Sequence, residues 1–178
     1  PEAMLRLERL HALKLWDHRL AALPEWLPGL ASLTELDISA NPLATLPDWL
    51  GRMQNLTSLD MSNLHGYELK EAPGWLAELR GLFYLNLSRH RLADLPGWLA
   101  GLQGMRMLSL LDNRFTTIPA VMADMSWLEK LYFQNNAIKV IPEEIAALPR
   151  LRDLRLGGNP IEEPPPEVVG KMESGQSV

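Results

Sequence analysis

Residues 33–55 read LTELDISANPLATLPDWLGRMQN, and this stretch decides the fold. It follows the pattern L-x-x-L-x-I-x-x-N-x-L-x-x-L-P and then x-x-L-x-x-M. The pattern returns along the chain in units that begin 23 residues apart, except for one step of 26 residues between Leu56 and Leu82. A period of this length predicts a solenoid, in which each unit packs only on its two neighbours.

Three columns of the repeat hold one kind of residue in nearly every unit. The fourth position is always leucine: Leu13, Leu36, Leu59, Leu85, Leu108, Leu131 and Leu154. The ninth position is asparagine or a substitute: His18, Asn41, Leu64, His90, Asn113, Asn136 and Asn159. A proline follows later in most units: Pro24, Pro47, Pro73, Pro96, Pro119 and Pro142. These matches in phase predict seven stacked units.

Positions four to six have the period of a β-strand, so their two apolar side chains point inward and the residue between them points outward. Strands this short are unstable alone, but parallel stacking about 4.8 Å apart buries one shared face. Asparagine suits the ninth column because its amide can pair backbone groups that turn inward. After the proline, x-x-L-x-x-L steps predict 3-10, polyproline II or single helical turns on the convex side.

In these columns the chain resembles leucine-rich repeat domains of the LxxLxLxxN type. Such repeats are common in cytoplasmic and bacterial proteins, including Roco GTPases, Ras-associated scaffolds and secreted effectors. The resemblance implies an α/β fold, a curved right-handed solenoid with a parallel β-sheet on its concave face. It also implies a protein–protein interaction module that binds a partner on that face, and not an enzyme.

The resemblance covers residues 1–169, with a partial repeat at 1–9 and about seven repeats at 10–169. We expect the polar tail at 170–178 to be disordered. The chain begins within a repeat, because Met4 and Leu7 stand in phase with Leu27 and Leu30. We interpret this start as a fragment of a longer protein, with a natural half-repeat cap as the alternative. The segment PPPEVVG resembles the exit from such repeats into a further domain.

Composition limits the partner classes. The chain of 178 residues is 47% hydrophobic, enough for one large core. Its net charge of −5 argues against a nucleic-acid or anionic-membrane surface. No long apolar run predicts a membrane span. The absence of cysteine favours a reducing compartment, so we expect a cytoplasmic protein, or an effector secreted into a host cytoplasm.

No pattern of residues predicts catalysis. Phosphate-binding glycine loops, H-E-x-x-H and cysteine nucleophiles are all missing from the sequence. The four histidines are His11, His18, His65 and His90. His18 and His90 stand in the asparagine column, where structural hydrogen bonding is the simpler role, and we expect no metal or other cofactor.

The outward positions three, five, seven and eight define the candidate binding surface. They predict an acidic strip of Asp17, Glu35, Asp37 and Asp60 over the first three repeats. They also predict an apolar cluster of Tyr84, Met107, Leu111 and Tyr132, rimmed by Arg89, Lys130 and Arg155. A cluster of this composition is typical of a binding hot spot, although single apolar residues are normal on any surface. The full candidate set is Trp16, Asp37, Asp60, Tyr84, Asn86, Arg89, Met107, Ser109, Leu111, Lys130, Tyr132, Gln134 and Arg155.

Within that cluster, Tyr132 is the residue we expect to matter most. Its replacement by alanine is expected to abolish partner binding and to leave the melting temperature nearly unchanged.

A second candidate surface is the tryptophan column, formed by Trp26, Trp49, Trp75 and Trp98. We expect this row to be half-buried against the convex side, with an exposed stripe for dimerisation or docking as the alternative. A third candidate is the insertion in the third repeat, within 64–73, which predicts a bulged loop carrying His65, Tyr67 and Lys70. Such loops often carry function, but an insertion without a partner is also well tolerated.

Two other functions stay open. The chain can be the recognition domain of a larger enzyme, such as a GTPase, kinase or ubiquitin ligase, whose catalytic part is absent from this sequence. It can also serve self-assembly, through uncovered repeat ends or the tryptophan row.

Overall fold

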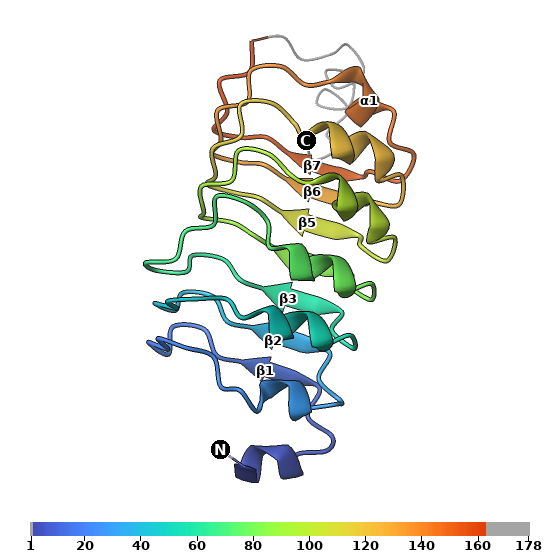
Figure 1. Ribbon diagram of the computed structural model, residues 1–178. Helices are drawn as coiled ribbons and strands as arrows, with labels where there is room; N and C mark the ends of the chain where they lie inside the picture. Colours follow the sequence, from blue (N-terminus) through green and yellow to red (C-terminus); the bar gives the residue numbers. More distant parts are fainter. Residues whose placement is uncertain (1, 163–178) are drawn as a thin grey trace.

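The computed structural model describes residues 2–162. Seven short parallel strands form one open sheet in sequence order, stacked from one end of the molecule to the other (Figure 1). The strands are β1 (Ala12–Lys14), β2 (Glu35–Asp37), β3 (Ser58–Asp60), β4 (Tyr84–Asn86), β5 (Met107–Ser109), β6 (Lys130–Tyr132) and β7 (Asp153–Arg155). The predicted solenoid with seven parallel strands is therefore confirmed. The segment PPPEVVG, the domain end at 169 and the tail at 170–178 lie outside the described residues.

Short helical turns precede the strands of the sheet. They are the 3-10 helices η1 (Glu2–Arg6), η2 (Leu27–Gly29), η3 (Asp48–Arg52), η4 (Gly74–Glu78), η5 (Gly97–Gly101) and η6 (Ala120–Asp124), and the α-helix α1 (Glu143–Ala146). In all but the first two, the repeat's proline is the N-cap residue with extended backbone. Proline suits this place because its own amide has no proton to satisfy.

The register of the sheet keeps the repeat columns in line. Leu36 pairs with Leu59, Leu59 with Leu85, and so on to Leu154, so each fourth-position leucine sits beside the next. The observed strands cover positions three to five, one residue earlier than the predicted four to six. The alternation still holds: Leu85 and Leu87 are fully buried, whereas Asn86 between them is half-exposed.

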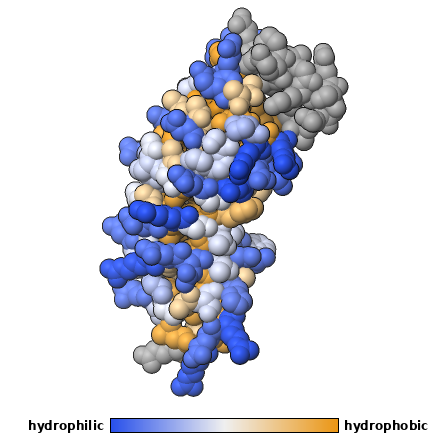
Figure 2. All heavy atoms as spheres, turned by 90° about the vertical axis from the view of Figure 1, so that its right-hand side faces the viewer, coloured by the Kyte–Doolittle hydropathy of each residue, from blue (hydrophilic) through white to orange (hydrophobic). Residues whose placement is uncertain are grey.

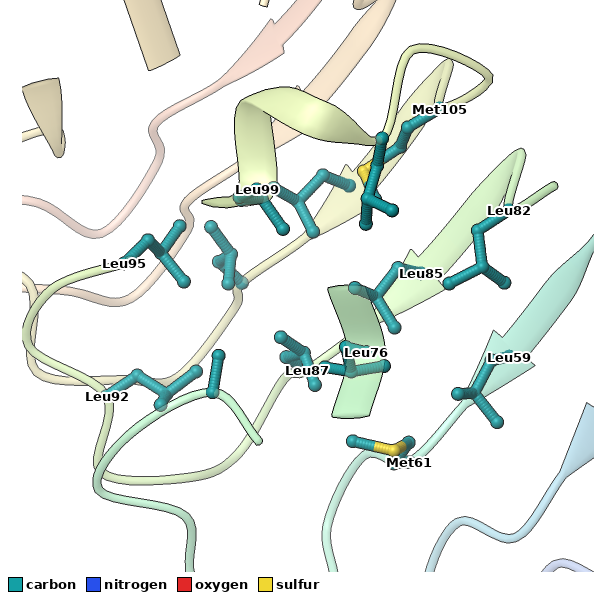
Figure 3. Close-up of a cluster of buried hydrophobic side chains, with 14 of the residues drawn as sticks. Leu59, Met61, Leu76, Leu82, Leu85, Leu87, Leu92, Leu95, Leu99 and Met105 are labelled. Carbon is teal, nitrogen blue, oxygen red and sulfur yellow. The ribbon is translucent and has the colours of Figure 1, made fainter. Parts of the chain in front are cut away.

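The core lies between the sheet and the helical turns. Figure 3 shows Leu85 of β4, and Leu87 just after that strand, in one cluster with Leu76 of η4 and Leu99 of η5. All four side chains have no exposed surface. Burying a leucine stabilises by about 1.5–3 kcal/mol, so this column holds the units together.

The asparagine column forms a hydrogen-bonded ladder. Asn41 is fully buried, and its Nδ2 donates to the carbonyls of Leu15 and Ile38 at 2.6 and 2.9 Å. Its Oδ1 accepts from the backbone N–H groups of His18 and Leu20 at 3.1 and 3.0 Å. One amide thus satisfies backbone groups of two neighbouring units. Equivalent bonds join Asn113, Asn136 and Asn159 to the units before them.

Position eight is left-handed in every repeat. Its residues have φ between 52° and 77°: Asp17, Ala40, Asn63, Arg89, Asp112, Asn135 and Gly158. This conformation turns the chain out of the strand, and the N–H of Ala40 then donates to the carbonyl of Ser62 at 3.0 Å. Glycine and asparagine tolerate positive φ, but alanine does so only with strain.

Replacing Ala40 with glycine is therefore expected to raise the free energy of unfolding by about 0.5–1 kcal/mol, because the left-handed strain is relieved. Ala44→Gly is the control, since Ala44 is exposed and is not among the residues with positive φ. Urea denaturation should show opposite signs for the two variants. A loss of stability in Ala40→Gly would contradict the strain.

The N-terminal end of the stack is incompletely covered. Leu5 of helix η1 and Leu7 just after it remain 40% and 45% exposed. The leucines of the first full repeat, such as Leu13 and Leu15, are only half-buried. The partial repeat thus shields the first repeat less than a full unit shields its neighbour.

Candidate functional site

The sheet face opposite the core carries the predicted binding residues in two rows. Position three aligns Tyr84, Met107 and Lys130, which are register partners on β4, β5 and β6. Position five aligns Asn86, Ser109 and Tyr132 on the same strands. Neighbouring strands lie about 4.8 Å apart, so Tyr84 and Met107 are in reach of each other. Both side chains are partly exposed.

The predicted cluster of four apolar residues is not one patch. Leu111 lies at position seven, four residues beyond Met107, which is about 13 Å along an extended chain. It lines a separate hollow at the carboxyl ends of the strands. The pair of Tyr84 and Met107 remains together at the start of the strands.

Tyr132 is buried by its neighbours and is not available on the surface. It is only 8% exposed, its hydroxyl donates to Asp153 Oδ2 at 2.8 Å, and the Arg155 guanidinium lies 4.6 Å from its ring centroid. Arg155 in turn donates to both oxygens of Asp153 at 3.0 Å. Burial and the bond to Asp153 raise the pKa of Tyr132. The structure therefore changes what we expect of Tyr132→Ala: the melting temperature should fall, because the truncation removes buried ring area.

Phe83 is a surface residue that the repeat columns missed. It sits at position two, next to Tyr84, and is 54% exposed. Its carbonyl accepts from the N–H groups of Arg106 and Met107, so it lies against the fifth unit. Figure 2 looks onto this side, where the strands begin, and shows hydrophobic side chains among hydrophilic ones over the middle repeats. We call Phe83, Tyr84 and Met107 the apolar patch.

Two carboxylates of the acidic strip, those of Asp37 and Asp60, also accept hydrogen bonds from nearby residues. Asp37 Oδ1 accepts from the backbone N–H and the hydroxyl of Ser39, and Asp60 Oδ1 does the same for Ser62. Asp60 Oδ2 accepts from Asn86 Nδ2 at 2.8 Å and lies 3.5 Å from the Tyr84 hydroxyl. Burial and the charge of Asp60 raise the pKa of Tyr84 to about 12. The phenol thus stays neutral and ties the apolar patch to the strip.

The hollow at the carboxyl ends of β2–β5 is lined by small polar side chains. Its residues are Ser39, Ala40, Ser62, Asn63, Asn86, Ser88, Arg89, Ser109, Leu111 and Asp112. The hydroxyls of Ser88 and Ser109 bond each other at 2.9 Å, and Arg89 Nε lies 3.3 Å from Asp112 Oδ2. The Arg89 side chain is largely exposed and that of Asp112 is partly exposed, so the ion pair contributes little stability. Gln134, also in the candidate set, has a buried Oε1 without a hydrogen-bond partner among the described residues.

Trp16 and Lys130 lie toward the two ends of the sheet face. Trp16 is 55% exposed beyond the end of β1, three repeats away from Tyr84. Lys130 is exposed on β6 beside Met107, where it places a positive charge next to the apolar patch.

The tryptophan row is a structural element. Trp26, Trp49 and Trp98 are partly buried against the core, and Trp75 is only 9% exposed. The expected half-buried row is confirmed, and no continuous exposed stripe is left for docking. Trp98 also borders a groove with Lys70, Asp94 and Pro96 between the third and fourth units.

The three extra residues of the third repeat lie within residues 65–68. In other repeats one residue separates the ninth column from the next buried side chain, as Pro42 does between Asn41 and Leu43. Here four residues separate Leu64 from Leu69, and the loop after β3 extends outward (Figure 1). His65 and Lys70 are exposed, whereas Tyr67 is half-buried against the core. The predicted bulge is present.

Residues 2–162 hold no group of three His, Cys, Asp or Glu side chains that could bind a metal ion. None of their helices is long and apolar enough to cross a membrane.

Comparison with solved structures supports the fold. A leucine-rich repeat protein of Leptospira interrogans is 26% identical with a TM-score of 0.68, and the match covers 94% of this chain and 54% of that protein. Internalin C2 from Listeria monocytogenes is 27% identical with a TM-score of 0.73, and the match covers 91% of this chain and 68% of that one. TLR13, solved in a complex with ssRNA13, is 27% identical with a TM-score of 0.75 over 92% of this chain and 24% of that one.

The chain thus spans about half the length of the Leptospira protein. No curated protein sequence matches it. The sequence profile of the family described as leucine rich repeat matches residues 8–64 and 106–161. These two regions make up more than half of the chain and include six of the seven strands, all except β4. The chain therefore belongs to the leucine-rich repeat family.

Proposed function

We propose that this domain binds another protein through its sheet face, with the apolar patch of Phe83, Tyr84 and Met107 as the centre of the contact. Leucine-rich repeat folds generally serve protein–protein interaction. The observation that carries the proposal is the pairing of Tyr84 with Met107 on adjacent strands, beside Phe83 at 54% exposure. Aromatic residues and methionine are enriched at the centres of protein interfaces.

Charged side chains flank the apolar patch on both sides, and they indicate which charges a partner should carry. Glu35, Asp37 and Asp60 lie on β2 and β3, and Lys130 lies on β6 on the other side of the patch. A partner with basic groups toward the third repeat and acidic groups toward the sixth would match this gradient. TLR13 is solved with RNA, but the acidic strip here would repel phosphates. A protein partner therefore fits this face better than a nucleic acid.

A second proposal is that the domain targets a larger protein to its partner. It is supported by the length of the Leptospira protein, of which this chain covers 54%. The binding surface would be the same, and catalysis would belong to other domains of the parent protein. We further propose a cytoplasmic location, or a host cytoplasm for a secreted effector, because the chain has no cysteine.

A pull-down from lysate of the source organism tests the contact surface. The wild type is compared with a Phe83→Ala/Tyr84→Ala/Met107→Ala variant, and both are checked for folding by circular dichroism. We expect at least a tenfold loss of the retained protein, since hot-spot truncations cost about 2 kcal/mol or more each. Tyr132 is left unchanged because it is packed under Arg155.

Val140→Ala is the matched control, since Val140 is also an apolar residue with 54% exposure but lies outside the sheet, after β6. It should retain the partner as the wild type does. Equal retention by the triple variant would reject the patch.

A further inference from the structure

His90 replaces asparagine in the ladder with a titratable group. Its Nε2 lies 2.8 Å from the carbonyl oxygen of Met61, and its Nδ1 lies 3.3 Å from the backbone nitrogen of Leu69. Asn113 makes the same two kinds of bond one unit later, donating to Leu87 O at 2.9 Å and accepting from Leu92 N–H at 3.1 Å. The imidazole therefore performs the role of the amide, and it is 5% exposed.

The partners of His90 require one protonation state. A carbonyl can only accept, so Nε2 carries the proton, and a backbone N–H can only donate, so Nδ1 must offer its lone pair. A second proton on Nδ1 would face the Leu69 N–H, and the bond would be replaced by two opposed donors. Asparagine cannot undergo this change, so the asparagine rungs of the ladder do not respond to pH in this way.

Leu69 is the point where the loop at 65–68, which contains the three extra residues, returns to the core. It is 5% exposed, and its carbonyl accepts from Arg91 N–H at 2.8 Å. Besides the packing of Tyr67 against the core, the loop has few other attachments. Tyr67 N–H donates to Leu64 O at 3.2 Å, and Glu68 pairs with Arg91 at the surface, where both side chains are more than 40% exposed. The bond to His90 is thus the buried attachment of this loop that depends on a proton.

The surroundings of His90 set the direction of its titration. Burial lowers its pKa from 6.5, and this outweighs the bond to Met61 and the carboxylates of Glu68 and Asp60, which favour the charged form. Arg89 and Arg91 flank it along the chain. Because the closed state binds the proton less well than the open state, the closed loop is stable above pH 6.5 and loses stability as the pH falls below it.

We propose that His90 is a proton-sensitive latch, and that its protonation releases Leu69 and the loop at 65–68. The loop follows Asn63, which lines the hollow beside the acidic strip. Release would change that rim of the sheet face at mildly acidic pH while the rest of the solenoid stays folded. This inference does not depend on the apolar patch.

Amide hydrogen exchange measured by NMR between pH 7.5 and 5 tests the latch. After correction for intrinsic exchange, protection at Leu69 should fall by up to tenfold for each pH unit below about 6.5, until the lowered pKa of His90 is reached, which is the slope that one proton gives. Leu87, whose N–H donates to Ser109 O at 2.9 Å, should keep its protection. Protection of the Leu69 amide that does not change with pH would overturn the proposal.

The variants His90→Asn and His65→Asn separate the two histidines. His90→Asn should remove the pH dependence at Leu69, and His65→Asn, at an exposed position in the same loop, should retain it. The same pH dependence in His90→Asn would contradict the latch. Should that variant fail to fold, the nitrogen shifts of His90 in the wild type decide. Their titration midpoint must coincide with the pH at which the fall in Leu69 protection levels off, and a different midpoint would reject the link.

Discussion

Phe133→Ala is expected to lower the free energy of unfolding by about 3–5 kcal/mol, the largest effect of any single change considered for this chain. Phe133 follows β6 at position six, where it has no exposed surface. Its ring meets Phe115 edge to face, with centroids 5.1 Å apart and planes at 84°. Alanine would remove the ring contact and leave a cavity in the middle of a stack that has core on both sides.

Urea denaturation followed by circular dichroism measures the effect, with Phe83→Ala as the control. Phe83 is the same residue type at 54% exposure, so its truncation should change the free energy of unfolding by only about 0.5 kcal/mol. Similar losses in the two variants would show that the core is not where the structure places it.

Asn41→Leu is expected to be the second most damaging change, at about 2–4 kcal/mol, because several buried backbone groups lose their partner at once. The Asn41 amide donates to Leu15 and Ile38 and accepts from His18 and Leu20. Leucine has nearly the same volume but can neither donate nor accept. The third repeat has a leucine, Leu64, in this column, and it is only 1% exposed, so a leucine fits there. The stability lost in Asn41→Leu therefore measures the missing hydrogen bonds more than a difference in size.

Asn55→Leu serves as its control. Asn55 is exposed and donates to one carbonyl, that of Ala31, at 2.8 Å. Its replacement should cost well under about 1 kcal/mol in the same denaturation experiment, since water can replace the bond. An Asn41→Leu variant as stable as Asn55→Leu would mean that the ladder is not needed to hold the units together.

The columns of the sequence were enough to predict the fold. Leucine at position four and asparagine at position nine recur in phase, and each has a local physical reason, so the strands and the ladder follow from them. The half-buried tryptophan row and the loop in the third repeat were also predictable, because both depend on the repeat alone. The left-handed position eight was not, since Asp, Ala, Asn, Arg and Gly share no obvious sequence signal there.

The candidate surface was harder to predict, because it depends on neighbours across the sheet. Tyr132 occupies an outward position, yet Asp153 and Arg155 of the next strand cover it. Phe83 occupies position two, which the alternation of the strand does not assign to either face, and only the structure shows its exposure. Long side chains contact residues of the adjacent repeats, and the pattern within a single repeat does not show these contacts.

The most direct test of the binding face places a photo-crosslinking amino acid at single positions and identifies the attached protein by mass spectrometry. Met107 on β5 and Phe83 beside β4 represent the proposed contact, and Val140, outside the sheet, represents the rest of the surface. The proposed function predicts one partner protein attached from positions 83 and 107, and not from 140. Attachment of that partner from position 140 alone, or equally from all three positions, would contradict it.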